Sequence, residues 1–225
     1  MSLKVVTVDG PAGAGKSTAS RALAQRLGFT HVDTGAMYRA VGVLARERGI
    51  DLDDDDALGL LVGGLSFELA DNGARLLVDG RDVSAAIRQA EAGELASRVA
   101  VRPVVRTCLV PLQRALAPAH GVVMEGRDIG TVVFPDAPAK LYLTAAPTER
   151  ARRRAVELRA RGETVDEAVL ARKLAERDRR DSQRAHSPLR PAADAVVLDT
   201  TTLALDAVVD EMERIARARL PFPRP

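Results

Sequence analysis

The fold is decided by the stretch Gly10-Pro11-Ala12-Gly13-Ala14-Gly15-Lys16-Ser17. This stretch fits the pattern G-x-x-x-x-G-K-[ST] at every fixed position. An apolar, β-branched run from Leu3 to Val8 precedes it, and apolar residues at helical spacing follow it from Lys16 to Leu27. Strand, glycine-rich loop and helix are the context in which this pattern forms a phosphate-binding loop, or P-loop. A glycine-rich turn that only caps a helix is a weaker explanation, because it requires neither the strand nor the lysine.

The residues of the loop suit phosphate binding chemically. Glycines let consecutive backbone N–H groups turn toward a phosphate, and the N-terminus of the following helix adds partial positive charge. Lys16 is suited to bridge the β- and γ-phosphates, and Ser17 is suited to ligate Mg²⁺. We therefore assign residues from Gly10 to Thr18 to nucleotide binding, Lys16 to catalysis and Ser17 to the metal.

Strand and helix patterns alternate along most of the chain. After the first apolar run, further short runs typical of buried strands occur at 31–32, 122–124, 141–143 and 195–198. Helical spacing fills the intervals, and we expect it to break near Pro103 and Pro111 between residues 96 and 117. The pattern predicts an α/β fold with a five-stranded parallel sheet covered by helices on both faces.

Residues 51–94 have a different character. An acidic run at 53–56 resembles a solvated helix start, and two strand patterns at 67–69 and 76–78 flank the turn Asn72-Gly73. We expect residues 51–89 to form an inserted lobe, with residues 1–50 and 90–225 as the core and a lid at about 148–166 within it. The net charge of +2 conceals an acidic segment at 51–94 and a basic segment at 150–190.

Composition narrows the class of protein further. Hydrophobic residues make up 46% and charged residues 28%, which is ordinary for a globular protein. There is no apolar run of the roughly 18 residues that a membrane span needs, so we expect a cytoplasmic protein without a membrane partner. The single cysteine, Cys108, excludes an internal disulfide. His31, His120 and His186 lack metal-ligand spacing, and we expect them at the surface or in loops.

Charged residues mark the expected second half of the site. Because ligands bind at the carboxyl ends of parallel strands, residues 33–34 and 125–128 should line one crevice with the P-loop. Arg177, Asp181 and Arg184 lie at i, i+4 and i+7 of one helix, and Arg150 and Arg154 lie four apart on another. Spacing alone leaves a solvated helix face open as the alternative for the first group, and an exposed helix or a nucleic-acid patch for the second.

Five stretches together resemble the bacterial cytidylate kinase family over nearly the whole chain. They are GPAGAGKST at 10–18, DTGAMYR at 33–39, EGRDIGTVVFPDA at 125–137, ERDRRDSQR at 176–184 followed by Pro188-Leu189, and AADAVVLDTT at 192–201. The resemblance implies the organisation of nucleoside monophosphate kinases: a P-loop core, a monophosphate-binding insert and a short arginine lid. It also implies direct in-line transfer of the γ-phosphoryl group of ATP to CMP or dCMP with Mg²⁺, in pyrimidine nucleotide metabolism.

The resemblance further implies roles for individual residues. Ser97, Arg106 and Asp128 match the family's cytosine readers; Thr34, Tyr38, Arg177 and Asp181 match its sugar contacts; Arg39, Arg127 and Arg184 match its acceptor-phosphate contacts. Arg150 and Arg154 match lid residues that contact ATP, and Lys16, Arg127, Arg184 and Arg154 are the expected catalytic cations. A carboxylate and a hydroxyl at the exocyclic amine, with an arginine at N3 and O2, complement the edge of cytosine.

Two alternative functions stay open at this point. A P-loop kinase for adenylate, uridylate or a small hydroxyl metabolite would share the loop and differ in its acceptor. A nucleotide-dependent regulator that binds nucleic acid would use the arginine-rich stretch, although four Phe, two Tyr and no Trp in the chain offer few stacking residues. We expect a monomer whose partners are small molecules rather than nucleic acid.

Overall fold

The core of the protein is one parallel sheet. The computed structural model describes residues 4–89 and 91–220, so Leu3 of the first expected strand lies outside this part. The strands are β1 (Val5–Asp9), β2 (Thr30–Asp33), β6 (Val122–Glu125), β7 (Ala139–Thr144) and β8 (Val196–Asp199), in the spatial order β2-β6-β1-β7-β8. Every neighbouring pair is parallel. The five-stranded sheet predicted from the sequence is confirmed.

Helices cover the sheet on both faces, and β1 and β6 are buried along their whole length. On one face, α1 (Lys16–Leu27) and α8 (Leu205–Arg219) pack together over Val6, Val8 and Leu141. On the other face, a π-helical turn at Ile129–Val133 packs against Val5 and Met124. Burial on both sides explains why β1 and β6 consist of continuous apolar runs instead of alternating ones, whereas β8 at the edge of the sheet is only partly buried.

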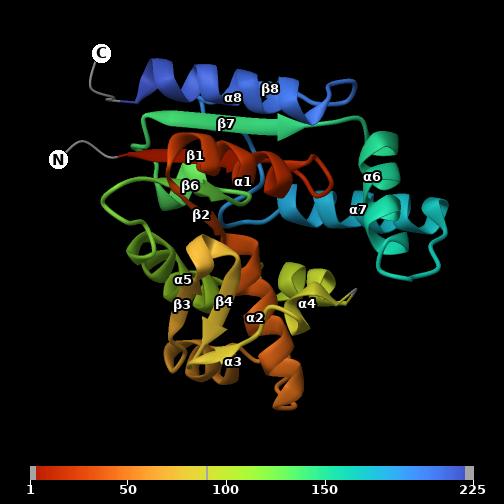
Figure 1. Cartoon of the computed structure of the whole chain (residues 1–225). Helices are drawn as coiled ribbons and strands as arrows, with labels where there is room; N and C mark the ends of the chain where they lie inside the picture. The colour runs from red at the N-terminus through yellow and green to blue at the C-terminus, as the bar shows by residue number, and fades with distance from the viewer. Residues whose placement is uncertain (1–3, 90, 221–225) are drawn as a thin grey trace.

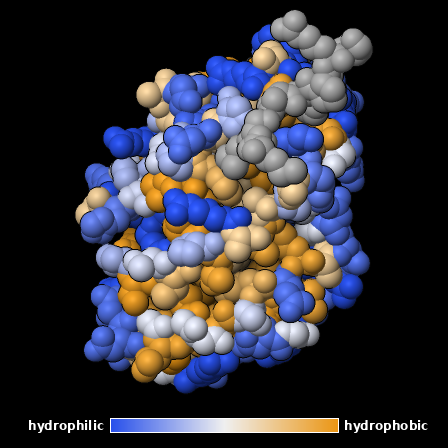
Figure 2. Space-filling model, turned by 90° about the vertical axis from the view of Figure 1, so that its left-hand side faces the viewer, coloured by the Kyte–Doolittle hydropathy of each residue, from blue (hydrophilic) through white to orange (hydrophobic). Residues whose placement is uncertain are grey.

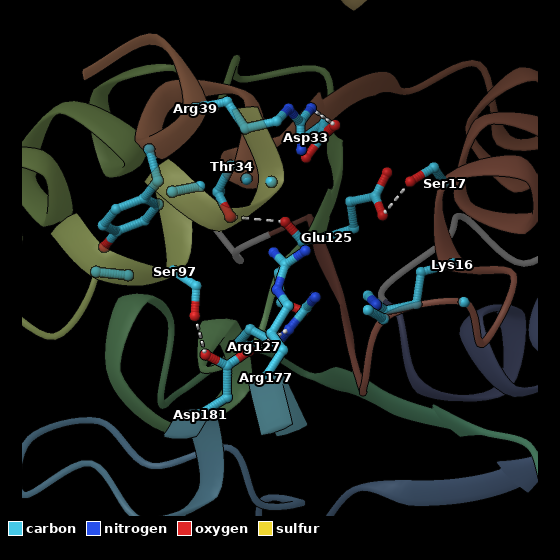
Figure 3. A pocket seen from close by; sticks show the side chains of 18 of the residues that line it. Lys16, Ser17, Asp33, Thr34, Arg39, Ser97, Glu125, Arg127, Arg177 and Asp181 are labelled. Atoms are coloured by element: carbon cyan, nitrogen blue, oxygen red, sulfur yellow. Dashed lines mark hydrogen bonds and ion pairs between the residues drawn. The ribbon is translucent and has the colours of Figure 1, made fainter. Parts of the chain in front are cut away.

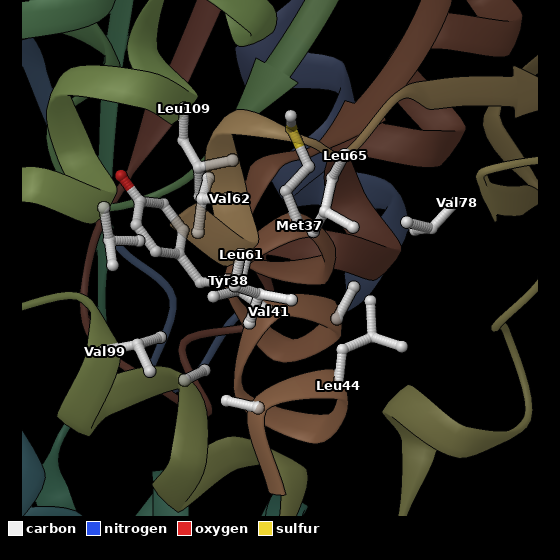
Figure 4. Packing of buried hydrophobic residues seen from close by; sticks show 14 of the residues in the cluster. Met37, Tyr38, Val41, Leu44, Leu61, Val62, Leu65, Val78, Val99 and Leu109 are labelled. Carbon is white, nitrogen blue, oxygen red and sulfur yellow. The ribbon is translucent and has the colours of Figure 1, made fainter. Parts of the chain in front are cut away.

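A second lobe lies next to the sheet, below it in the view of Figure 1. It contains α2 (Thr34–Glu47), α3 (Asp55–Gly63), the antiparallel strands β3 (Phe67–Ala70), β4 (Arg75–Val78) and β5 (Arg81–Asp82), α4 (Ala92–Val99) and α5 (Pro103–Ala115). Short 3-10 turns occupy Asp71–Gly73 and Ala86–Arg88. Figure 4 shows Met37, Val41 and Leu44 of α2 within the apolar cluster that joins these elements. The expected boundaries of the insert at 51 and 89 remain a prediction.

The basic segment forms two helices beside the P-loop end of the sheet (Figure 1). They are α6 (Pro147–Arg159) and α7 (Glu167–Ser182), separated by a turn in which Gly162 has φ +83°. The base of α6 rests on the P-loop, because a Cβ at Gly13 would lie 2.8 Å from the backbone oxygen of Arg150. A side chain at Gly13 would therefore push α6 away from the loop.

One expected break is wrong. Pro103 begins α5, but Pro111 lies inside that helix and does not end it. Proline removes one backbone N–H from the helix, and Pro111 sits on the exposed face, where water can hydrate the carbonyl oxygen that loses its donor. Figure 2 shows that apolar residues gather over the lower half of the face carrying α5 and β3, with more polar residues above. Within the described residues, no helix is long and apolar enough to cross a membrane.

Candidate functional site

The P-loop presents a buried lysine at the start of α1. Gly13 and Gly15 have φ values of +78° and +85°, which L side chains rarely adopt. Lys16 Nζ donates a hydrogen bond to the backbone oxygen of Pro11 at 2.8 Å. Burial, together with the nearby positive charge of Arg127, lowers the pKa of Lys16 to about 7. A phosphate bound at the loop would give the ammonium group of Lys16 a negatively charged partner.

Glu125, at the carboxyl end of β6, is the centre of a buried polar group. Its Oε2 accepts a hydrogen bond from the Ser17 hydroxyl at 2.8 Å, and its backbone oxygen accepts one from the Thr34 hydroxyl at 2.8 Å. Its Oε1 lies 2.9 Å from Nε2 of His31. The expectation that His31 is a surface or loop residue is therefore wrong: it lies in β2 and is 3% exposed. His31 and Val32 are both buried because this strand is covered on both faces.

Asp181 organises the opposite wall of the site (Figure 3). Its Oδ2 accepts from Nε of Arg127 at 3.2 Å, and its Oδ1 accepts from the Ser97 hydroxyl at 3.4 Å. Its backbone oxygen accepts from Nε of Arg184 at 3.1 Å. One aspartate on α7 thus joins α4, the loop after β6 and the end of its own helix. Nε of Arg177, which points into the same space, has no hydrogen-bond partner among the described residues.

A second buried ion pair lies beyond this wall. Arg106 of α5 pairs with Asp128, and its guanidinium group lies 5.7 Å from the centre of the Tyr38 ring. The loop that carries Asp128 is fixed from β1, because the Asp9 carboxylate accepts hydrogen bonds from the amides of Ile129 and Gly130, each at 2.8 Å. Burial raises the pKa of Asp9 to about 6, although these amide bonds act in the opposite direction.

Most of these residues line one cavity of about 630 Å³, whereas His31 and Asp9 are not part of its wall. Of the residues assigned to the site from the sequence, all contribute to its wall except Gly10, Pro11, Ala14 and Arg150. Ten arginine and lysine side chains and five acidic ones line it. The excess of positive charge fits a ligand that carries several negative charges.

Arg150 does not line this cavity, and its assignment to ATP binding stays a prediction. It is buried, and it donates to the backbone oxygens of Ala12 and Ala145, both at 3.1 Å, while it pairs with Asp178 of α7. It therefore links the P-loop to α6 and α7. A second cavity of about 680 Å³ opens on the other side of the loop, between α6 and the segment after β8. The two cavities share the wall residues Gly13, Gly15, Thr18 and Glu157.

The family model for cytidylate kinase matches residues 6–218. The chain belongs to the cytidylate kinase family. It is 48% identical to the cytidylate kinase of Geobacter sp. (strain M21), over 96% of this chain and 94% of that protein. It is 51% identical to the cytidylate kinase of Pelotomaculum thermopropionicum, over 91% of this chain and 92% of that protein. A solved structure of an uncharacterized protein from Eubacterium ventriosum, 11% identical, matches with a TM-score of 0.50 over 96% of this chain and 99% of that one, and shares the fold.

Some residues of this cytidylate kinase site were not assigned from the sequence. Arg88, in the 3-10 turn Ala86–Arg88, and Arg161, in the turn between α6 and α7, both line the first cavity, and the Arg161 guanidinium donates to the backbone oxygen of Arg88 at 3.0 Å. Arg153 reaches Thr200 at the edge of the second cavity, with 2.9 Å to its hydroxyl. The arginine-rich stretch hinted at Arg153 and Arg161, but nothing in the acidic insert marks Arg88. The described residues contain no cluster of three or more His, Cys, Asp or Glu side chains placed to hold a metal ion.

Proposed function

We propose that this cytidylate kinase family member transfers the γ-phosphoryl group of ATP directly to the phosphate of CMP or dCMP. The observation that carries the proposal is the shared cavity, in which the P-loop lysine faces a group of arginines and basic residues outnumber acidic ones by ten to five. A loop built for a triphosphate and an opposing cationic wall suit two anionic substrates that meet end to end.

The acceptor is proposed to bind between α2, α4 and α7. The buried pair Arg106–Asp128, with Ser97 nearby in the wall, offers donors and acceptors that complement the edge of cytosine. Uracil would present a carbonyl oxygen to the Asp128 carboxylate and would be disfavoured. Arg177 and Asp181 are proposed to contact the sugar, together with Thr34 and Tyr38, as the family resemblance implies.

The acceptor phosphate is proposed to lie among Arg39, Arg127 and Arg184. Arg39 and Arg127 each spend part of their hydrogen-bonding capacity on a single carboxylate, which leaves N–H groups for phosphate oxygens. Arg184 is buried, and burial lowers its pKa despite the neighbouring Asp181. An anionic phosphate in this position would compensate these closely placed cations.

ATP is proposed to bind across the P-loop, with its base and sugar in the second cavity. That cavity is lined by the apolar side chains of Leu203 and Leu205 and by Arg152 and Arg153, which suit a flat aromatic base and its phosphates. Since both cavities include Gly13 and Gly15, the phosphate chain would pass along the loop toward the acceptor.

The residues beside the loop fit a magnesium ion. The Ser17 hydroxyl and the Glu125 carboxylate are hard oxygen donors 2.8 Å apart, and Mg²⁺ commonly uses one or two protein oxygens while waters and phosphates complete its shell. Ser17 and Glu125 would hold the ion, which when bound supplies charge neutralisation at the β- and γ-phosphates.

Catalysis is proposed to rest on alignment and charge, without a covalent enzyme intermediate or a strong base. The acceptor phosphate oxygen is already an adequate nucleophile, so the protein must hold it in line with the γ-phosphorus. Lys16, Arg127, Arg184 and Arg154 would stabilise the charge of the transferring group. Arg154 lies on α6, where it pairs with Glu157 at 2.7 Å at the cavity wall, and we propose that it turns toward the transferring group when the substrates are bound.

A coupled assay of ATP consumption with CMP, dCMP, UMP and AMP tests this function. We expect CMP and dCMP to be the best acceptors, and a preference for AMP or UMP would refute the cytosine assignment. Asp128→Asn should lower kcat/KM for CMP by about 30-fold or more, because it breaks a buried, hydrogen-bonded charge pair. Asp136→Asn changes an exposed aspartate on the same segment and should leave turnover unchanged.

One chain supplies the P-loop, the lid and the acceptor arginines of this cavity. We therefore propose that the enzyme acts as a monomer. Light scattering during gel filtration, at the protein concentration of the assay, checks this: a dimer as the active species would contradict it.

A further inference from the structure

His31 is a buried histidine outside the set of residues that line the cavity. It lies in β2, next to β6 in the sheet, and its side chain is 3% exposed. Nε2 lies 2.9 Å from Oε1 of Glu125, whose side chain is equally buried. Nδ1 has no hydrogen-bond partner in residues 4–89 and 91–220. A buried polar ring with only one partner is costly compared with an apolar side chain of similar size.

The two oxygens of Glu125 have different neighbours. Oε1 faces Nε2 of His31, and Oε2 faces the Ser17 hydroxyl at 2.8 Å (Figure 3 shows the latter pair). The terminal torsion of a glutamate is broad, so a carboxylate with one partner rotates easily. Partners on both oxygens fix its plane. Because an ionised carboxylate only accepts hydrogen bonds, the nitrogen that faces it must carry the proton.

The position of His31 is itself fixed from the insert. The turn between β3 and β4 packs on its backbone, since a Cβ at Gly73 would lie 1.9 Å from the His31 carbonyl oxygen. Gly73 has φ +88°, a conformation that glycine adopts without strain. The strand β2, which carries His31, is therefore held by its pairing with β6 and by the contact of its backbone with the turn between β3 and β4.

We propose that His31 is a positioning residue that holds the Glu125 carboxylate with Oε2 directed toward Ser17, ready to ligate the divalent cation of the ATP complex. This inference rests on the proposed function, because it assumes that Ser17 and Glu125 form the metal site. His31 itself does not touch the nucleotide or the metal. Groups that orient a ligand in this way commonly change metal affinity by about 10- to 100-fold when they are removed.

Three variants separate positioning from packing. His31→Leu keeps the volume and removes the donor, while His31→Gln places an amide N–H near the former Nε2. Thr30→Val changes the neighbouring residue of β2, whose hydroxyl forms a hydrogen bond with the exposed His120 at 3.1 Å, and serves as the control. The measurement is Mn²⁺ binding to the enzyme with a non-hydrolysable ATP analogue, followed by electron paramagnetic resonance.

We expect His31→Leu to weaken Mn²⁺ binding about 10-fold or more, with recovery of most of this affinity in His31→Gln. Thr30→Val should bind Mn²⁺ like the wild type. In turnover assays, His31→Leu should raise the Mg²⁺ concentration required for half-maximal activity and leave KM for CMP nearly unchanged. Equal Mn²⁺ affinity in the wild type and His31→Leu would overturn the proposal, and so would a loss that His31→Gln does not restore.

A measurement on the wild type avoids any folding defect. ¹⁵N correlation spectra of the histidine side chains report which ring nitrogen carries the proton, and we expect a proton on Nε2 of His31. An Nε2 without a proton overturns the proposal. Failure of the wild type to phosphorylate CMP would refute the proposed function instead, because Mn²⁺ binding and the ring tautomer are measured without an acceptor.

Discussion

The buried Lys16 should make nucleotide binding take up a proton. Burial and the charge of Arg127 lower its pKa from 10.5 to about 7 in the empty protein. At pH 8 only about one-tenth of the chains then carry a charged lysine. A bound triphosphate returns the pKa toward its ordinary range, so the uptake at pH 8 should be about 0.9 proton per nucleotide.

The sign of the pH dependence follows from the same shift. Nucleotide affinity should fall as pH rises above 7, by up to about tenfold per pH unit. The free energy of unfolding of the empty protein should show the opposite trend between pH 7 and 10.5, because the unfolded chain binds more protons than the folded one in that range. Below pH 7 the full cost of burying the charged lysine is present, and above 10.5 it is gone.

Isothermal titration calorimetry measures the uptake directly. The binding enthalpy of a non-hydrolysable ATP analogue is recorded at pH 8 in buffers of different ionisation enthalpy, and its slope against that enthalpy gives the number of protons. Lys16→Arg is the matched control, since a guanidinium group stays charged throughout this range. Uptake below about 0.2 proton by the wild type, or the same uptake by Lys16→Arg, would refute the reasoning.

Three further outcomes are expected. As pH rises from 4 to 6, the free energy of unfolding should fall by up to about 3 kcal/mol, because the raised pKa of the buried Asp9 stabilises the fold only while its carboxyl group is protonated. Urea unfolding measures this step, and Asp9→Asn should lack it. Gly73→Ala should cost more than about 2 kcal/mol in the same assay, since its Cβ meets the backbone, whereas Gly80→Ala has a positive φ without a close neighbour and should cost only about 1 kcal/mol. Arg150→Met should raise KM for ATP about 10-fold by freeing the P-loop carbonyl of Ala12, with a change below about threefold in KM for CMP, as steady-state kinetics would show.

The sequence was sufficient to predict those parts of the fold whose geometry is set by residues close together in the chain. The P-loop follows from consecutive glycines between a strand and a helix, and α1 has the expected bounds from Lys16 to Leu27. Helical spacing also placed Arg177 and Asp181 on one face of α7, whereas Arg184, expected on the same helix, lies two residues beyond its last residue, Ser182; all three reach the cavity. In each case the relevant geometry is set within a few residues by helix or strand periodicity.

Other features depend on contacts between distant segments. Helical spacing could not predict the partners of Arg150, because Ala12 and Asp178 come into reach only when α6 and α7 pack beside the P-loop. The burial of His31 depends on Glu125, 94 positions away in the chain. Pro111 illustrates a third limit of prediction from the sequence. A helix tolerates an internal proline on its solvent-exposed face, and the sequence alone does not show which face of α5 is exposed.

The wall that the two cavities share has a consequence for inhibitor design. Because Gly13, Gly15, Thr18 and Glu157 border both spaces, a molecule with a group for each cavity needs only a short linker along the loop. Once one group is bound, the other is held at millimolar effective concentration, about the level reached with short flexible linkers. Affinity then depends strongly on linker length, since a linker too short to span the loop loses the gain and a longer one dilutes it. Such a bivalent ligand would be selective for the spacing between the cavities, which neither of its two binding groups could recognise alone.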